Sequence, residues 1–171
     1  MRTRVFRVRL LAGVATGLLL ISCSGTSTEG PTRGTDGRYP YWEKGAGARE
    51  AAAFMGVAVP EGATEVKGAV RVQPQEKVYL LSFLTDAGAA DAMVDDLRPE
   101  GPLRARDRSS SLSGDGFRHL GLASPQDVEG VRTATACPPC VGDPRRRNVQ
   151  AVEIHVGADP RGRTRVYLTA Y

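Results

Sequence analysis

The sequence has 171 residues, of which 41% are hydrophobic and 25% are charged, and this balance excludes a chain too polar to fold around a core. Its net charge of +4 overstates how basic the chain is, because four of the 23 basic residues lie before Cys23 and no acidic residue lies there. The rest holds 19 basic and 19 acidic residues, so the composition gives no support to nucleic-acid binding.

The N-terminus has the order of an export signal. A basic segment, which carries Arg2, Arg4, Arg7 and Arg9, precedes an uncharged apolar run over residues 10–21. A basic segment followed by an apolar run is typical of a signal peptide. The run is shorter than the roughly 20 apolar residues that a membrane-spanning helix needs, which disfavours a permanent span.

The end of this run, Leu20-Ile21-Ser22-Cys23, resembles the lipobox of bacterial lipoproteins, in which an aliphatic, a permissive and a small residue precede the modified cysteine. The resemblance implies cleavage before Cys23, diacylglycerol on its thiol and acylation of the new N-terminus, with chains such as palmitate. Two or three acyl chains are enough for durable anchoring, here on the extracytoplasmic side of the cell membrane. Ordinary secretion and an uncleaved N-terminal anchor are the alternatives.

Three segments follow from this interpretation. Residues 1–22 are the lipoprotein signal peptide, and residues 23–38 are the lipidated cysteine with a flexible tether rich in Ser, Thr, Gly and Pro. Residues 39–171 are long enough for a single extracytoplasmic domain, which begins near Tyr39 and Trp42. Twenty arginines against three lysines, with abundant Ala, Gly and Val, indicate a high-GC bacterium.

The first half of the expected domain has clear periodicity. Apolar residues at helical spacing predict a helix over 46–55, and alternation predicts a half-buried strand over 64–73 with Val66, Val70 and Val72 on one side. Residues 77–85 are apolar on both faces, which predicts a strand in the interior of a sheet.

A second helix is predicted over 86–98. Residues 100–116 are polar and rich in turn formers, which predicts a surface loop. Strands are predicted weakly over 131–137 and more clearly over 149–156 and 166–170. Together these elements predict an α+β domain, with an antiparallel sheet of four or five strands and two helices packed on one face.

This layout resembles that of uncharacterised small lipoproteins of high-GC Gram-positive bacteria. The likeness rests on Val59-Pro60-Glu61-Gly62-Ala63-Thr64 and on the strand end Phe83-Leu84-Thr85. It brings no catalytic residues with it, and we expect neither a cofactor nor a metal.

The compact motif Cys137-Pro138-Pro139-Cys140 has three interpretations. With Cys23 lipidated, two cysteines remain outside the cytoplasm, which favours a local disulfide. A thioredoxin-like redox site has the same spacing but needs a helix that begins at the first cysteine, and the Val141-Gly142-Asp143-Pro144 segment cannot continue one. Metal binding needs further ligands, and the two histidines, His119 and His155, stand alone in the sequence.

Arg145, Arg146 and Arg147 form the densest charge run. A solvated loop explains this run about as well as contact with anionic lipid or cell-wall polymer. For a small-molecule cleft, the candidate lining residues are Tyr79, Phe83, His155 and Tyr167.

Two functions remain open. The first is a membrane-anchored binding or interaction module, whose partner is a cell-envelope protein or polymer. The alternative is a thiol-disulfide oxidoreductase that uses Cys137 and Cys140. We favour the first and a non-enzymatic role, because no catalytic motif is recognisable.

Overall fold

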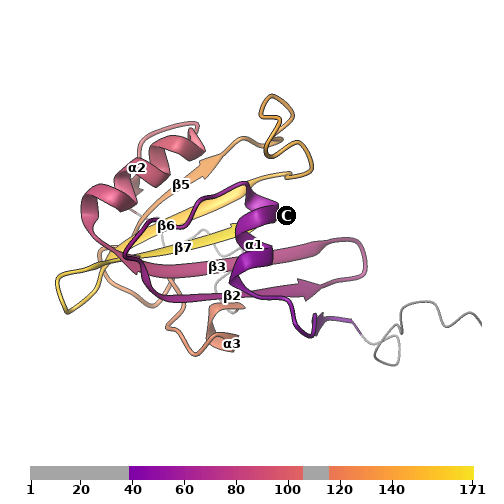
Figure 1. Ribbon diagram of the computed structural model, residues 1–171, viewed down its shortest axis with the longest axis horizontal. Coiled ribbons are helices and arrows are strands. Elements are labelled where there is room, and N and C mark those ends of the chain that lie inside the picture. Colours follow the sequence, from indigo (N-terminus) through magenta and orange to yellow (C-terminus); the bar gives the residue numbers. More distant parts are fainter. Residues whose placement is uncertain (1–38, 106–115) are drawn as a thin grey trace, which may run out of the picture. The chain divides into compact units, whose positions relative to one another are not determined.

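The structure, a computed structural model, describes residues 39–105 and 116–171. The expected signal peptide, Cys23, the tether and most of the predicted 100–116 loop lie outside these residues. At the centre is a seven-stranded antiparallel sheet with the order β1-β2-β3-β7-β6-β5-β4 (Figure 1). Its strands are β1 (Tyr41–Trp42), β2 (Thr64–Val72), β3 (Lys77–Thr85), β4 (Arg104–Ala105), β5 (Arg132–Ala136), β6 (Val152–Ala158) and β7 (Thr164–Ala170).

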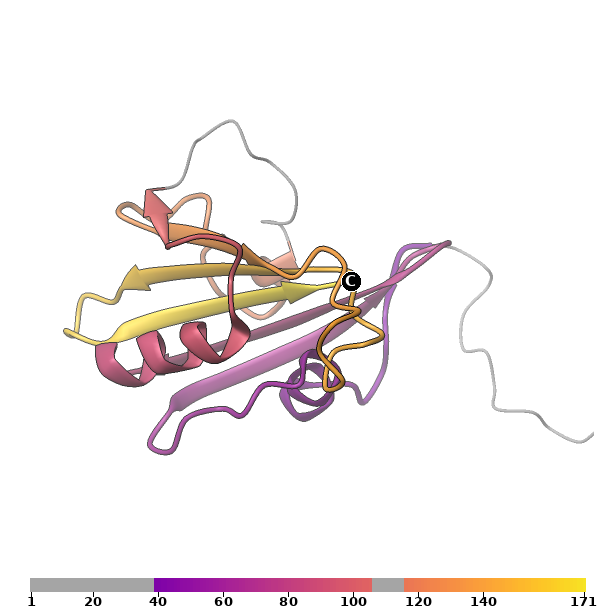
Figure 2. The same ribbon diagram turned by 90° about the horizontal axis from the view of Figure 1, so that it is seen from above.

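Within the described residues, three short helices flank the sheet: α1 (Ala48–Met55), α2 (Ala87–Leu97) and α3 (Gly116–His119). Figure 2 shows α1 and α2 on the same side, where their apolar residues join those of β3, β6 and β7 in the main core. The α3 helix belongs to a second, smaller cluster, in which Phe117 packs with Leu80 and Tyr167. Apolar packing therefore covers both faces of the sheet.

The predicted fold class is wrong in two respects. The sheet has seven strands, not four or five, and a third helix packs on the face that we expected to be without one. Both edge strands have only two residues, too few to produce an alternating pattern, and β4 lies within the predicted 100–116 loop. The predicted helices and the longer strands correspond to observed elements, but they describe only part of the sheet.

The β3 strand is an interior strand, as its apolar pattern predicts. It pairs with β2 on one side and with β7 on the other. Leu81 and Phe83 belong to the main core, whereas Val78 and Leu80 belong to the smaller cluster. An apolar residue at nearly every position therefore matches a strand that is buried on both faces.

The β2 strand departs from its predicted alternation. A bulge between Thr64 and Lys67 inserts one extra residue, and Glu65 within it has a φ of 49°. Because a bulge adds one residue to the strand, the side chains at and before it no longer follow the alternation of the rest of the strand. Val66 is therefore 41% exposed, although the prediction placed it on the same buried side as Val70.

The α1 helix crosses β2 at a glycine. A Cβ atom on Gly68 would lie 2.5 Å from the Cα atom of Ala48, so no larger residue fits without a backbone shift. The helix ends at Gly56, which adopts a left-handed conformation with a φ of 60° and donates its N–H to the last turn. These two glycines fix where α1 starts and stops against the sheet.

Candidate functional site

A pocket of about 460 Å³ lies where α1, the β2–β3 hairpin and the segment before β6 come together. Aromatic and amide side chains make up most of its lining. The lining residues are Phe54, Gln75, Glu76, Lys77, Tyr79, Asn148, Gln150 and Tyr171. We call this site the aromatic pocket. Concave sites with aromatic walls and a few polar groups are the usual form of small-ligand sites.

Two stacked rings form one wall of the aromatic pocket. Phe54, in the last turn of α1, and Tyr79, on β3, have ring centroids 3.8 Å apart and planes only 8° from parallel. Both side chains are half-buried at the edge of the main core. A phenol with its ordinary pKa of 10.0 is protonated at neutral pH, and burial raises the pKa of Tyr79 further, so its hydroxyl can donate a hydrogen bond.

The charge of Lys77 is paired with a carboxylate. Its Nζ atom donates to both carboxylate oxygens of Glu43, at 2.7 and 3.1 Å. The hydrogen bond from Lys77 to Glu43 raises the pKa of Lys77, against the opposing effect of burial. The remaining charged side chain of the lining, Glu76, is exposed on the hairpin. The pocket therefore holds no unpaired cation.

A buried arginine fixes the end of α1, which carries Phe54. Arg146 is 1% exposed, and its Nε donates to the carbonyl of Met55 at 2.9 Å, while Nη2 donates to the carbonyl of Gly56 at 3.2 Å. Nη2 also donates to the carboxylate of Asp96 at 3.0 Å, and Nη1 donates to Asp143. We call this arrangement the Arg146 clamp. It joins the C-terminal ends of α1 and α2 to the loop before β6.

The disulfide braces the segment that brings residues 148 and 150 to the pocket. Cys137 and Cys140 are bonded to each other, and the Cys140 N–H donates to the carbonyl of Val149 at 3.1 Å. The Val149 N–H in turn donates to the carbonyl of Arg146 at 2.8 Å. The amide side chains on either side of Val149 line the aromatic pocket. The two motifs that stand out in the sequence therefore support one wall of the pocket.

The geometry around the cysteines differs from that of a thioredoxin-like redox site. No helix begins at Cys137, and none occurs between β5 and β6, a segment that is fully described. Cys140 is 1% exposed. The disulfide thus lies in a loop, without the helix N-terminus that would stabilise a thiolate.

The three arginines of the charge run have different environments. Arg146 forms the clamp, and Arg145 donates through Nη1 to both carboxylate oxygens of Asp96 at 3.0 Å. Arg147 is exposed and makes no hydrogen bond or ion pair within residues 39–105 and 116–171. Contact of this run with anionic lipid or polymer remains a prediction, for which Arg147 has an exposed guanidinium that no described residue pairs.

Of the four residues proposed for a cleft, Tyr79 lines the aromatic pocket. Phe83 is buried in the main core, and Tyr167 is buried in the smaller cluster on the other face. His155, on β6, is paired opposite Tyr167 and so lies on that other face. The sequence did not indicate Phe54 or the amides at 148 and 150, because they join the pocket through tertiary contacts alone.

The other histidine packs against the single tryptophan. The rings of His119 and Trp42 are stacked, with centroids 3.9 Å apart and planes 3° from parallel. The guanidinium of Arg71 lies 6.0 Å from the centre of the indole ring. This stack fastens α3 to β1 on the face opposite α1 and α2, which gives His119 a structural explanation.

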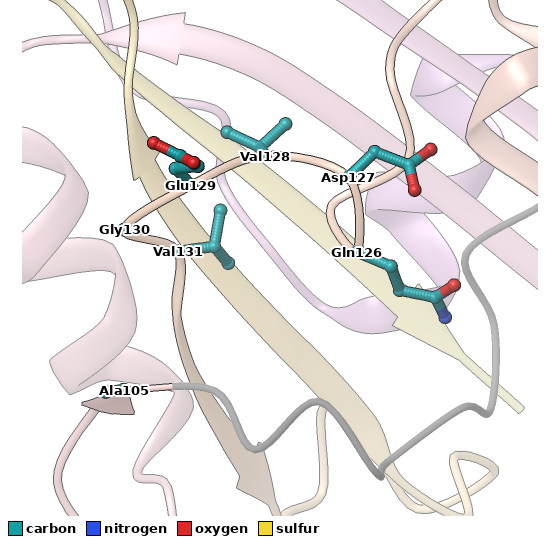
Figure 3. A pocket seen from close by; sticks show the side chains of 7 residues that line it. All are labelled: Ala105, Gln126, Asp127, Val128, Glu129, Gly130 and Val131. Carbon is teal, nitrogen blue, oxygen red and sulfur yellow. The ribbon is translucent and has the colours of Figure 1, made fainter.

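A second pocket, of about 440 Å³, lies beside the loop that precedes β5 (Figure 3). Residues 126–131 and Ala105 line it. Figure 3 shows that its ionisable side chains are the carboxylates Asp127 and Glu129, and Asp127 is paired with Arg118 at 2.9 Å. Since this lining has no aromatic residue, the aromatic pocket is the better candidate site.

Within the described part of the chain, no three His, Cys, Asp or Glu side chains are placed to hold a metal ion. No helix there is both long and apolar enough to cross a membrane. Comparisons of the chain with protein-family models, with curated proteins and with solved structures give no match.

Proposed function

We propose that this protein is a bacterial lipoprotein, held through lipid on Cys23 at the extracytoplasmic side of the cell membrane, with a domain that acts as a binding module. The arrangement of residues 1–23 supports the lipoprotein assignment: a basic segment is followed by a short apolar run and then by a lipobox-like tetrapeptide. A disulfide in the domain agrees with an oxidising compartment.

The aromatic pocket supports the proposal that the domain is a binding module. Its walls come from α1, β3 and the loop before β6, and the Arg146 clamp and the disulfide brace them. The lining contains no histidine and no cysteine, and its lysine is paired with Glu43. These groups suit binding better than general-base or nucleophilic catalysis.

The thiol-disulfide oxidoreductase receives less support. Its nucleophile would need a lowered thiol pKa, which such enzymes obtain from a helix N-terminus or from nearby cations. The loop position of Cys137 and the burial of Cys140 provide neither a helix nor an accessible pair of sulfur atoms.

Metabolic labelling with palmitate tests the lipoprotein assignment. The wild-type chain, expressed in a bacterium, should incorporate label and sediment with membranes. Cys23→Ser should lose the label, whereas Cys137→Ser, the matched control, should keep it. An unlabelled wild-type chain, or a Cys23→Ser variant that is still labelled, contradicts the proposal.

A further inference from the structure

We propose that the aromatic pocket binds a neutral, hydroxyl-rich saccharide unit. This inference rests on the proposed extracytoplasmic binding function and names the class of ligand. Three properties of the lining support it: aromatic rings, a set of unpaired amides and the absence of an unpaired cation.

The aromatic wall matches the shape of a sugar ring. The Phe54 and Tyr79 rings cover each other's inner faces, and both residues line the pocket while only half-buried, so an outer ring face is the surface left for a ligand. A pyranose presents a flat face of C–H groups, which is apolar and can pack against an aromatic surface. The protonated Tyr79 hydroxyl adds a hydrogen-bonding group at the same wall.

The amides match the chemistry of hydroxyl groups. Gln75, Asn148 and Gln150 line the pocket, and their side chains make no hydrogen bond to the described residues. A carboxamide has both donor and acceptor atoms, as a hydroxyl has, so one amide can pair with two neighbouring hydroxyls. Three such groups around one aromatic wall favour a ligand with several hydroxyls.

The charges disfavour anionic ligands. Lys77 is paired with Glu43, and the guanidinium of Arg146 donates its hydrogen bonds to the carboxylate and carbonyl oxygens of the clamp. A phosphate or carboxylate ligand would therefore meet Glu76 without an unpaired cation among the lining residues to offset it.

The strand pairing disfavours an extended peptide. Peptides that add to a sheet need a free strand edge. Tyr79 lies on β3, whose main-chain groups are already paired with β2 and β7. A ligand in the pocket must therefore be recognised through side chains.

The test uses the full chain, purified in a detergent without a sugar head group. The probes are trisaccharides of glucose and of N-acetylglucosamine, with binding followed by saturation-transfer NMR and titration calorimetry. We expect at least one to bind with a dissociation constant of about 1 mM or lower. Asn148→Ala should weaken binding about fivefold to tenfold, the usual effect of losing one hydrogen bond.

Matched variants make the result specific to the pocket. Tyr79→Phe keeps the ring stack but removes the hydroxyl, so it should weaken binding no more than Asn148→Ala does, whereas Tyr79→Ala should abolish binding. Gln150→Ala should weaken binding, while Gln126→Ala, which removes an amide from the other pocket, should have no effect. Circular dichroism checks that each variant is folded.

Failure to bind either trisaccharide at about 10 mM overturns the inference. So does equal binding by Asn148→Ala and Gln126→Ala, or a preference for inorganic phosphate or for peptides over the saccharides. Palmitate labelling of the same preparation separates this failure from that of the proposed function. A labelled chain that does not bind saccharides contradicts only the proposed ligand class, whereas an unlabelled chain contradicts the lipoprotein assignment.

Discussion

The Nε atom of Arg146 donates a hydrogen bond to the main-chain carbonyl of Met55 at 2.9 Å, across 91 residues of sequence. The last carbonyls of a helix have no partners within the helix, and they carry its partial negative charge. A guanidinium with five donors can satisfy several such acceptors at once. Arg146 does so for α1 while it also pairs with Asp96 and Asp143.

Replacement of Arg146 should therefore destabilise the domain strongly. We expect Arg146→Ala to lower the free energy of unfolding by about 3–5 kcal/mol, because it leaves buried acceptors without donors. Chemical denaturation measures this change. Arg145→Ala, which removes exposed ion pairs, should cost at most about 1 kcal/mol, and Arg147→Ala should stay within about 0.5 kcal/mol. Similar values for all three variants would contradict the clamp.

The clamp should also make the free energy of unfolding decrease at acid pH. The Arg145 backbone N–H, followed by the Arg145 side chain and the charge of Arg146, lowers the pKa of Asp143 below 3.8, against the effect of burial. Burial opposes ionisation of Asp96 most strongly, but hydrogen bonds from Arg145 and Arg146 outweigh it and lower the pKa of Asp96 as well.

A carboxyl group with a lowered folded-state pKa contributes stability above its unfolded pKa, and this contribution is lost as the pH falls through the folded value. The free energy of unfolding should therefore decrease below about pH 4. Asp143→Asn should make the decrease shallower, and Asp95→Asn, which removes a carboxylate outside the clamp, serves as the control. Denaturation at a series of pH values tests this, and an unchanged slope in Asp143→Asn is the opposing result.

The disulfide should have a modest structural effect and no redox activity. A ring of four residues contributes about 2 kcal/mol by the chain-entropy relation, so the double variant Cys137→Ser/Cys140→Ser should lose roughly that much stability. The wild-type protein should not catalyse reduction of insulin by dithiothreitol. Catalysis that disappears in the double variant would restore the oxidoreductase alternative.

The close contact between α1 and β2 predicts a sensitive glycine. Gly68→Ala should destabilise by about 1–3 kcal/mol, because its Cβ would lie within 2.5 Å of Ala48 and force the helix away from the sheet. Gly142→Ala is the matched control, since a Cβ there meets no atom within 4 Å. Thermal unfolding compares the two, and equal midpoints would argue against this packing.

Long elements with regular patterns could be predicted from the sequence. The helical spacing over α1 and α2 and the alternation or continuous apolar character of β2, β3, β6 and β7 each indicate the observed element. The sheet size could not be predicted, because β1 and β4 have two residues each and β5 consists of small and polar residues. The bulge at Glu65 likewise leaves no clear local pattern.

The candidate site was mostly hidden from sequence reasoning. Three consecutive arginines indicate a solvated loop. Arg146 is buried instead, because main-chain carbonyls at the end of a helix accept its hydrogen bonds, and no residue type indicates such acceptors. Tyr79 could be proposed for a cleft from its aromatic ring, but its partner Phe54 lies on a helix and meets it only after folding. The disulfide could be proposed because the two cysteines are close in sequence and an even number of cysteines remains after Cys23. The hydrogen bond from Cys140 to Val149 could not be predicted.

Intact-mass spectrometry of the protein, extracted from the membranes of a bacterium that expresses it, tests the central claim most directly. The proposal predicts the mass of residues 23–171 increased by one diacylglycerol and one N-linked acyl chain, both on Cys23. A mass that matches residues 1–171, or an unmodified thiol at Cys23, would contradict it.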